Sequence, residues 1–492
     1  MASNISIGGL ASGLDSNAII DALVSVERIP IQQLQAQKKA NQDKINLFNT
    51  FRGKVDALRN KANTLGTLSG LMSFKVSASV EGLATVTASG SATPGTHTLL
   101  VEQVSATDRW AFDGVTDPAA DLATADSQSI SFTYDGQSYS VAVRQGASSL
   151  NELAAGINAE ADGKVAASVV NSGTSSSPNW QLVLTAEDTG QAFRIQNLTT
   201  TVAGLSINGT GPNGAGVAQS PNNISVGRNA VAIVDGLRVE RTDNDFDDVI
   251  AGVSISLLDS DVNTTMQFTV ESDKSAIKGR IKEFIDAYND VIKFVRDQNK
   301  YDEEKGAGGP LFGENALRSI QRSLSGVLFG QSAAQISADT AGYGTLRLVG
   351  VESQADGSLK INDKVMDAKM DADLARFADL FADTDGFDNQ GALVGDPDYY
   401  TDASADTGLG DDLAREIDKI VKSYGNQGGQ FFKGIFDSRL ETLNSNNKQI
   451  DDRISEREDR VERMQAQLKA RYAALESMMA KLQSQSSYLN SK

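Results

Sequence analysis

Residues 436–482 read FDSRLETLNSNNKQIDDRISEREDRVERMQAQLKARYAALESMMAKL, and this stretch decides how the chain must fold. Its apolar residues form two rows, each built on a seven-residue repeat, with one row four positions after the other. The first row holds Phe436, Leu443, Ile450, Met464 and Met478, and the second holds Leu440, Ile454, Val461, Leu468, Leu475 and Leu482. This pattern predicts a long helix with one apolar seam that another helix must cover.

The other end of the chain carries the same pattern. Phe48, Val55 and Ala62 alternate with Phe51, Leu58 and Leu65 at spacings of three and four. Each buried Leu or Ile contributes about 1.5–3 kcal/mol, so an exposed seam would be costly. We therefore expect the two ends to pair with each other or with further copies, as in an assembly subunit. The residues predicted to pair helices are Leu34, Phe48, Phe51, Val55, Leu58, Leu65, Leu440, Leu443, Ile450, Ile454, Val461, Met464, Leu468, Leu475, Met478 and Leu482.

Between the ends, the apolar period changes from helical to alternating. Alternation rich in Val, Ile and Thr predicts strands at 97–104, 129–143, 180–186, 229–240 and 249–270. Stretches 75–104 and 229–270 resemble two halves of one sheet domain with an insertion between them. The expected fold class is α+β and multidomain, with long terminal helices forming a coiled-coil-like stem and β-rich domains inserted into it.

Capping residues, prolines and glycines predict where the helices begin and end. Asp15 or Ser16 should cap a first helix that Pro30 breaks, and a second helix should run over 31–65. Further helices are expected at 149–158, 275–295, 314–329, 363–382, 410–423 and 434–489, with a hairpin at 345–361 turning at Asp356-Gly357 and a loop at 384–407.

These elements predict six consecutive parts. Residues 1–74 form a disordered start and stem helices, and 75–107 the first part of an inner β domain. Residues 108–225 form an outer β-rich insertion, and 226–272 complete the inner domain. Residues 273–430 form a helical stem domain with a hairpin, and 431–492 form the C-terminal heptad helix.

Composition excludes several classes of protein. The net charge is −19, and residues 77–272 alone carry −15, which argues against nucleic-acid binding. The chain has no cysteine, so disulfides and thiolate chemistry are excluded. It has no run of about 18 apolar residues, so membrane insertion is not expected. Its polar start, without a basic residue before Arg28, predicts that no cleaved signal peptide is present.

Candidate catalytic and metal-binding motifs are weak. His97 is the only histidine and lies in a strand pattern, so we interpret it as structural. Gly209, Gly211 and Gly214 match a dinucleotide motif, but Pro212 and a Gly-rich stretch predict a loop. The acidic runs at 243–248 and 383–388 lack the glycine and glutamate of a calcium loop. We expect no enzyme activity, no cofactor and no metal; a glycosidase with paired carboxylates is a minor alternative.

Several segments together resemble the flagellar filament cap proteins (hook-associated protein 2). They are Gly9-Leu10-Ala11-Ser12-Gly13-Leu14-Asp15, Val234-Asp235-Gly236, 247–257, Phe284-Ile285-Asp286-Ala287-Tyr288-Asn289, Gly350-Val351-Glu352 and the ending from Tyr472 to Leu489. The resemblance covers both ends and the 229–300 block in order, and it does not extend to residues 108–225, as expected for the variable outer region of such proteins. It favours the cap over flagellin and the hook–filament junction proteins, which also carry terminal heptads.

The resemblance implies a homo-oligomeric cap, usually a pentamer, at the distal end of the bacterial flagellar filament. Such a cap promotes flagellin folding and polymerisation and prevents loss of monomers. It implies an extracellular location, export through the flagellar type III apparatus, and flagellin, hook–filament junction proteins and an export chaperone as partners. The alternative is a surface adhesin whose outer β domain binds host surface glycans on a helical stalk.

Overall fold

The computed structural model describes residues 15–207, 221–302, 307–330, 339–384, 386–393, 396, 399–403, 408–425 and 431–489. The chain divides into two compact units. The first joins Met1–Leu71 to Ile277–Lys492, and the second is Met72–Ala276. The predicted α+β multidomain class, with long terminal helices and inserted β domains, is confirmed. The expected disordered start and the 209–214 glycine motif lie outside the described residues.

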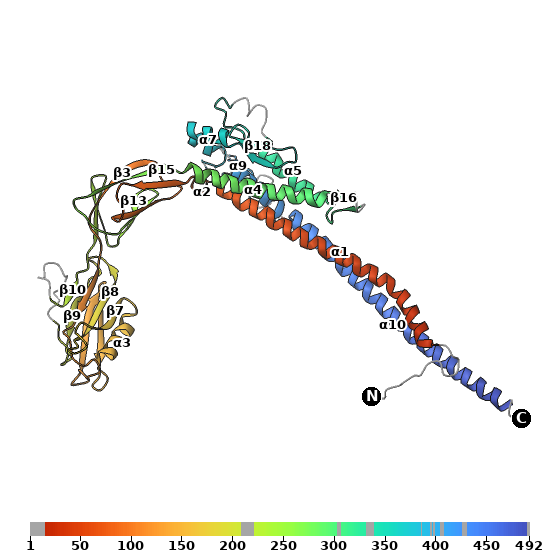
Figure 1. Ribbon diagram of the computed structural model, residues 1–492, viewed down its shortest axis with the longest axis horizontal. Coiled ribbons are helices and arrows are strands. Elements are labelled where there is room, and N and C mark those ends of the chain that lie inside the picture. Colours follow the sequence, from red (N-terminus) through yellow and green to blue (C-terminus); the bar gives the residue numbers. More distant parts are fainter. Residues whose placement is uncertain are drawn as a thin grey trace. The chain divides into compact units, whose positions relative to one another are not determined.

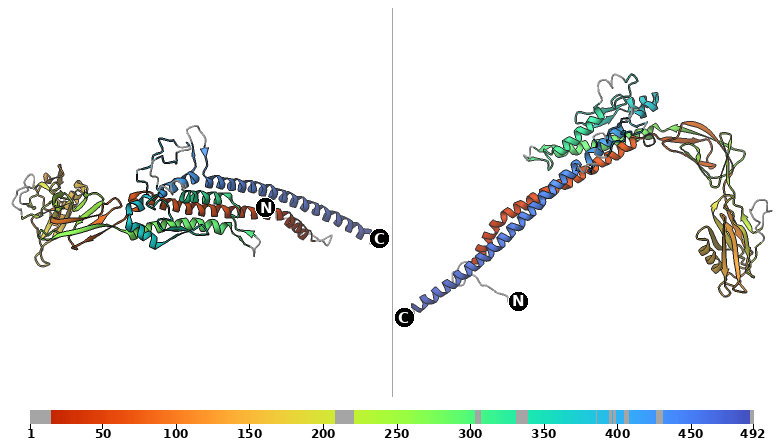
Figure 2. Two further views of the ribbon diagram at one scale, coloured as in Figure 1. Left: turned by 90° about the horizontal axis from the view of Figure 1, so that it is seen from above. Right: turned by 180° about the vertical axis from the view of Figure 1, so that it is seen from behind.

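The first unit is built on the two terminal helices. Helix α1 (Ser16–Leu65) has 50 residues and α10 (Ile435–Leu489) has 55. They lie side by side in every view (Figures 1 and 2). The expected cap is confirmed, because the Asp15 carboxylate accepts a hydrogen bond from the Ala18 amide at 3.0 Å.

The expected break at Pro30 is wrong, because α1 continues through it. Proline removes one amide donor and leaves the carbonyl four residues earlier without its helical partner. That carbonyl belongs to Val26, which is 62 % exposed and so lies on the solvent side of α1. Val24 and Ile31, on either side of the proline, are buried. Packing on both sides therefore holds the helix together.

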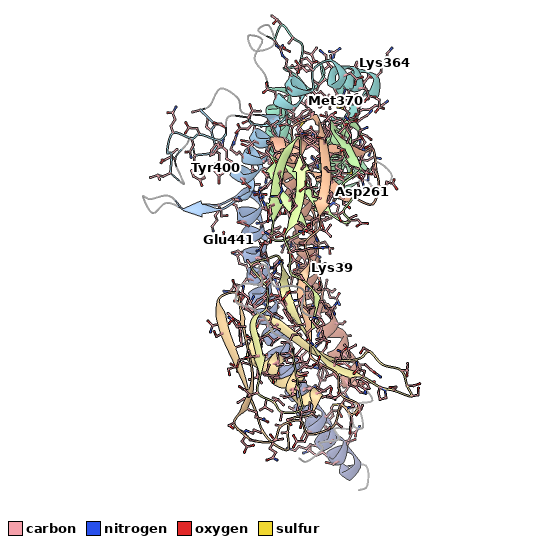
Figure 3. The ribbon with its side chains drawn as sticks, turned by 90° about the vertical axis from the view of Figure 1, so that its left-hand side faces the viewer. Lys39, Asp261, Lys364, Met370, Tyr400 and Glu441 are labelled. Carbon is pink, nitrogen blue, oxygen red and sulfur yellow. The ribbon has the colours of Figure 1, made fainter. Side chains whose placement is uncertain are left out.

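Shorter helices complete the first unit. They are α2 (Leu68–Leu71), α4 (Lys274–Asn299, which begins at the end of the second unit), α5 (Asn315–Phe329), α7 (Asp363–Ala372), α8 (Leu374–Asp379) and α9 (Leu409–Val421). The single helix expected at 363–382 is wrong, because Asp373 is extended and its carboxylate caps α8 by accepting from the Arg376 amide at 3.0 Å. Helix α7 is two-faced, with Met370 buried and Lys364 exposed (Figure 3).

Three two-stranded ribbons accompany these helices. They are β16 (Tyr301–Asp302) with β17 (Ala307–Gly308), β18 (Val351–Ser353) with β19 (Leu359–Ile361), and β20 (Tyr424–Gly425) with β21 (Phe431–Phe432). The predicted hairpin with its turn at Asp356-Gly357 is confirmed, since β18 and β19 pair antiparallel and Gly357 has φ +83°.

One β-rich core of the second unit combines strands that are distant in the sequence. Its five-stranded sheet has the order β1-β15-β3-β11-β12, and a three-stranded sheet has the order β13-β14-β2. Leu99, Phe246 and Phe268 are fully buried in the shared core. The strands are β1 (Phe74–Ala78), β2 (Ala84–Ala88), β3 (Gly95–Gln103), β11 (Ala230–Val234), β12 (Leu237–Arg241), β13 (Asp245–Ile250), β14 (Val253–Leu257) and β15 (Thr265–Ser272).

A second core lies within the intervening sequence. Its sheets have the orders β10-β4-β8-β7 and β6-β5-β9, and helix α3 (Leu150–Ala161) packs with them. Its strands are β4 (Thr107–Ala111), β5 (Gln128–Tyr134), β6 (Gln137–Val143), β7 (Val165–Asn171), β8 (Trp180–Thr189), β9 (Gln196–Thr200) and β10 (Asn223–Ser225). The strands expected at 129–143 and 229–240 are both hairpins, because Asp135-Gly136 and Asp235-Gly236 adopt positive φ.

The residues expected to be chemically inert are satisfied locally. His97 Nδ1 lies 2.7 Å from Asp235 Oδ2 and so ties β3 to the β11–β12 turn. In the acidic run, Asp248 belongs to β13 and pairs with Arg241 at 2.8 Å. Within the described ranges, no helix combines the length and apolarity needed to cross a bilayer.

Candidate assembly surface

The two terminal helices are partners within one chain. Lys38 Nζ lies 2.6 Å from Asp451 Oδ1, and the rings of Phe51 and Phe436 are 5.5 Å apart. Residues farther along α1 therefore contact residues that come earlier in α10, so the two helices are antiparallel. Farther along, Val461 of α10 forms a small core with Ile20, Val24 and Ile31 of α1. Ile454, Met464, Leu468 and Tyr472 pack against this core.

The other end of the seam is buried among more helices of the same unit. Phe51 is fully buried, and its ring stacks on Phe294 of α4 at 5.0 Å with an interplanar angle of 8°. Phe436 of α10 meets the same ring edge-on at 65°. Arg59 of α1 pairs with Asp418 of α9. The 48–65 half of α1 is thus covered by α4, α9 and α10.

Charged side chains also connect the helices at this end of the seam. Glu314, before α5, accepts hydrogen bonds from Arg439 at 2.7 Å and Lys44 at 3.2 Å, so it joins α10 to α1. Burial, the largest single influence, raises the pKa of Glu314, but the hydrogen bonds from Arg439 and Lys44 and the charges of these two residues together outweigh it and hold the pKa below its usual range. The hydrogen bond from Ser423, followed by the Arg52 charge, lowers the pKa of Asp437.

The predicted pairing residues fall into three groups along the helices. Eight are buried: Phe48, Phe51, Val55, Leu58, Leu65, Leu443, Ile450 and Val461. Five are half-buried: Leu34, Leu440, Ile454, Met464 and Leu468. Three are exposed: Leu475 at 45 %, Met478 at 65 % and Leu482 at 54 %. The structure brings the first two groups into the helical unit and leaves the third uncovered.

The exposed group continues the seam beyond its covered part. Leu475, Met478, Met479 and Leu482 follow the spacing i, i+3, i+4, i+7, which places them on one face of α10. The same period leads back to Val461 and Leu468. A contiguous exposed apolar face of this kind is a common feature of surfaces that associate with other molecules.

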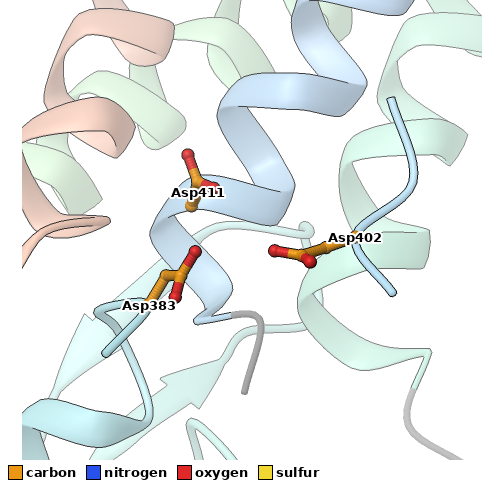
Figure 4. A group of neighbouring side chains, drawn as sticks. All are labelled: Asp383, Asp402 and Asp411. Carbon is orange, nitrogen blue, oxygen red and sulfur yellow. The ribbon is translucent and has the colours of Figure 1, made fainter. Parts of the chain in front are cut away.

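The acidic residues around α9 form a separate cluster (Figure 4). One carboxylate oxygen from each of Asp383, Asp402 and Asp411 lies within 4.8 Å of the others, as in a cation site. Arg415 already meets this cluster, because it pairs with Asp411 and lies 3.4 Å from Asp402. The cluster therefore ties the 383–402 loop to α9. In the same loop, Asp383 and Asp388 accept backbone hydrogen bonds in turns, while Asp385 lies outside the described residues.

Family models match both ends of the chain around this helix pair. The model of the flagellar hook-associated protein 2 N-terminus matches residues 12–108, and that of its C-terminus matches residues 227–484. Together they cover more than half of the chain. This chain belongs to the flagellar hook-associated protein 2 family. The predicted resemblance is confirmed, and the family is one of structural flagellar cap proteins, not of enzymes.

Individual relatives agree with this assignment. The A-type flagellar hook-associated protein 2 of Pseudomonas aeruginosa is 25% identical over 474 residues, covering 92% of this chain and 89% of that protein. The flagellar hook-associated protein 2 of Escherichia coli K12 is 25% identical over 390 residues, covering 75% and 78%. The matched descriptions lend no support to the surface-adhesin alternative.

The fold also resembles a solved structure. The crystal structure of the flagellar cap protein FliD D1-D2-D3 domains from Escherichia coli superposes with a TM-score of 0.61. The match covers 81% of this chain and 99% of that chain, at 20% sequence identity. It supports the hook-associated protein 2 fold.

Sequence reasoning missed the charged residues that hold the seam. Lys38 and Asp451 are 413 positions apart, and neither carries a local signal of its partner. Glu314 lies before a short helix and reads as an ordinary surface acid. Asn447 takes an apolar position of the heptad repeat on α10; it is 8 % exposed, and its Oδ1 has no hydrogen-bond partner among the described residues. A buried polar residue in a seam can select register.

Proposed function

We propose that this member of the hook-associated protein 2 family caps the distal end of the flagellar filament, where it promotes flagellin folding and polymerisation and prevents loss of monomers. One observation carries the proposal. Family matches at both chain ends converge on the α1–α10 pair, and the last turns of α10 leave Leu475, Met478 and Leu482 exposed by 45–65 %. A stem held together internally, with an uncovered apolar end, is suited to reversible contact with other helices.

The predicted pairing residues have two roles in this proposal. Those buried or half-buried between α1 and α10 hold the stem, because each is covered by helices of its own unit. The exposed Leu475, Met478 and Leu482 contact other molecules at the filament. The six-part division of the chain belongs to the same proposal, with residues 108–225 as its outer domain and 75–107 with 226–272 as its inner domain.

The proposed partners follow from the family. The cap is a homo-oligomer, with five copies as the expected number. Flagellin and the hook–filament junction proteins are its partners at the filament, and an export chaperone binds it before secretion through the flagellar type III apparatus. Its place is extracellular, at the flagellum tip. Its mechanism is steric confinement and breakable helix contacts, with no covalent step and no cofactor.

Filament growth in a strain lacking the protein tests this function. The strain is complemented with the wild-type chain, with Leu475→Glu/Met478→Glu, or with Ala473→Glu/Ala480→Glu. All four positions are exposed on α10, but Ala473 and Ala480 lie on the face opposite Leu475 and Met478, so the control introduces the same charges away from the apolar surface. We expect the first variant to give short filaments and flagellin in the medium, and the control to behave as wild type.

Two results would contradict the proposal. Filaments of normal length without the protein would remove the cap function itself. Normal growth with Leu475→Glu/Met478→Glu would remove the role of the exposed face. Leu468→Glu is a useful companion, because Leu468 packs against the Ile20–Val461 core and its loss should also loosen the stem.

A further inference from the structure

Two grooves run along the α1–α10 pair where Ile31 meets Val461. One encloses about 610 Å³ and is lined by Arg28, Gln32 and Gln35 of α1, with α10 residues opposite. The other encloses about 470 Å³ and is lined by a different set that includes Pro30 and Leu34. The two grooves share no residue.

One groove is acidic. Its α10 side consists of Glu458, Asp459, Val461, Glu462 and Gln465, and its only charge from α1 is Arg28. Three carboxylates and one guanidinium leave a net charge of −2. We call this the acidic flank.

The other groove is basic. Its α10 side consists of Arg453, Glu456, Arg457 and Arg460, and its α1 side is uncharged. Three guanidinium groups and one carboxylate leave a net charge of +2. We call this the basic flank.

Helical geometry places the two flanks on opposite sides of the seam. Glu458 and Glu462 are four residues apart and share a face, as do Arg453 and Arg457. At 100° per residue, seam residue Val461 lies between these two faces. The helix pair therefore presents opposite charges on its two sides at one level, over residues 453–462.

These charges are available to a partner. All eight charged residues that line the grooves are exposed. Within the described part of the chain, none of them has an oppositely charged side chain within 4.0 Å, although Lys38 and Asp451 form such a pair nearby. The charges of the two flanks therefore remain available for salt bridges with another molecule.

We propose that the two flanks are the contact surfaces between neighbouring copies, with the acidic flank of one helix pair against the basic flank of the next. The two flanks lie at the same height along the stem, so the acidic flank of each copy can contact the basic flank of the next through one repeated interface. Such a head-to-tail contact closes into a ring when the rotation between neighbouring copies divides a full turn evenly. A foreign partner would require only one flank. The inference rests on the proposed function and specifies which surfaces of the stem join the copies.

Charge reversal in the full-length chain tests this contact. The basic-flank variant is Arg457→Glu/Arg460→Glu, and the acidic-flank variant is Glu458→Arg/Glu462→Arg. The swapped variant combines all four changes, so its flanks are complementary again with their signs exchanged. Glu and Arg have similar helix propensities, so α10 should persist, which far-UV circular dichroism verifies. Sedimentation equilibrium at low and high salt measures self-association.

We expect each two-site variant to weaken self-association by about tenfold at low salt, because like charges then face each other. The swapped variant should return to within about threefold of wild type, and salt should weaken wild-type association. The matched control is Asp452→Arg/Arg463→Glu, exposed positions on the same helix that line neither groove, and it should leave association unchanged.

The inference is overturned if the two-site variants associate as wild type does, or if the swapped variant stays as weak as they are. It is also overturned if the charge dependence arises only when filament ends are added, since the flanks would then bind a filament protein. Each of these results leaves the cap function standing, because that function fails only when filaments grow normally without the protein.

Discussion

Phe51 joins three helices of the stem, so its replacement tests whether the seam is held within one chain. Its fully buried ring lies against Phe294 of α4 and Phe436 of α10, with ring centroids 5.0 and 5.5 Å away. Truncating a buried Phe to Ala costs about 3–5 kcal/mol. Two aromatic contacts of about 0.5–1.5 kcal/mol each place Phe51→Ala near the upper end of that range.

Two control variants separate the effect of losing buried volume from the effect of replacing a Phe side chain. Phe51→Leu keeps most of the apolar volume but removes both ring contacts, so it should cost about 1–3 kcal/mol, less than Phe51→Ala. Phe312→Ala makes the same chemical change in the same unit, but Phe312 is 48 % exposed, so its cost should stay below about 1 kcal/mol.

Guanidinium unfolding read by two probes measures the effect. Far-UV circular dichroism at the helical band reports mainly the helical unit. Tryptophan fluorescence reports the β-rich unit, because Trp110 and Trp180 are the only tryptophans and both lie there. We expect Phe51→Ala to lower the helical transition and leave the fluorescence transition unchanged. If Phe51→Ala costs no more than Phe312→Ala, the assignment of the seam to one chain is refuted.

Three further predictions use the same unfolding assay. Pro30→Ala should stabilise the helical unit by up to about 3 kcal/mol, because it restores an amide donor inside α1; a loss of stability would mean that the proline is required there. Glu314→Gln should destabilise the helical unit at neutral pH. Because the folded pKa of Glu314 is lowered, its contribution is full above about pH 4.3 and is lost as the pH falls, so the variant should show a smaller loss in acid; an unchanged pH profile would refute this. The hydrogen bond with His97, as the largest cause, lowers the pKa of Asp235, so Asp235 stabilises the folded β-rich unit above about pH 3.9 and loses this contribution in acid. Asp235→Asn should therefore reduce the loss of stability in acid by less than about 1 kcal/mol, and a larger effect would contradict the exposed position of Asp235.

Local features of the structure were predictable from the sequence. The cap at Asp15, the turn at Asp356-Gly357 and the seven-residue repeat of α10 each depend on residues a few positions apart. Ser149 likewise caps α3 through a reciprocal hydrogen bond with Glu152. Backbone dihedral preferences and hydrogen bonds between residues close in the sequence decide such features, so the local sequence is sufficient to predict them.

Other features depended on packing across the sequence. The uninterrupted course of α1 through Pro30 requires Val24 and Ile31 to be buried on either side of it. The sequence predicted one continuous helix over 363–382, but the backbone is extended at Asp373, because the Asp373 side chain caps the next helix, α8. The acidic cluster of Asp383, Asp402 and Asp411 gathers residues up to 28 positions apart around Arg415.

By itself, the sequence determined that both ends of this chain are helices with apolar seams, that the middle is β-rich, and that the chain belongs with the flagellar caps. Only the tertiary structure decided that the two ends cover each other, that Leu475, Met478 and Leu482 stay exposed, and that opposite charges flank the pair. The reason is physical. The heptad repeat is a property of each helix alone and follows from local backbone geometry. Which apolar residues of the repeat become buried depends on the offset at which two helices distant in the sequence pack together.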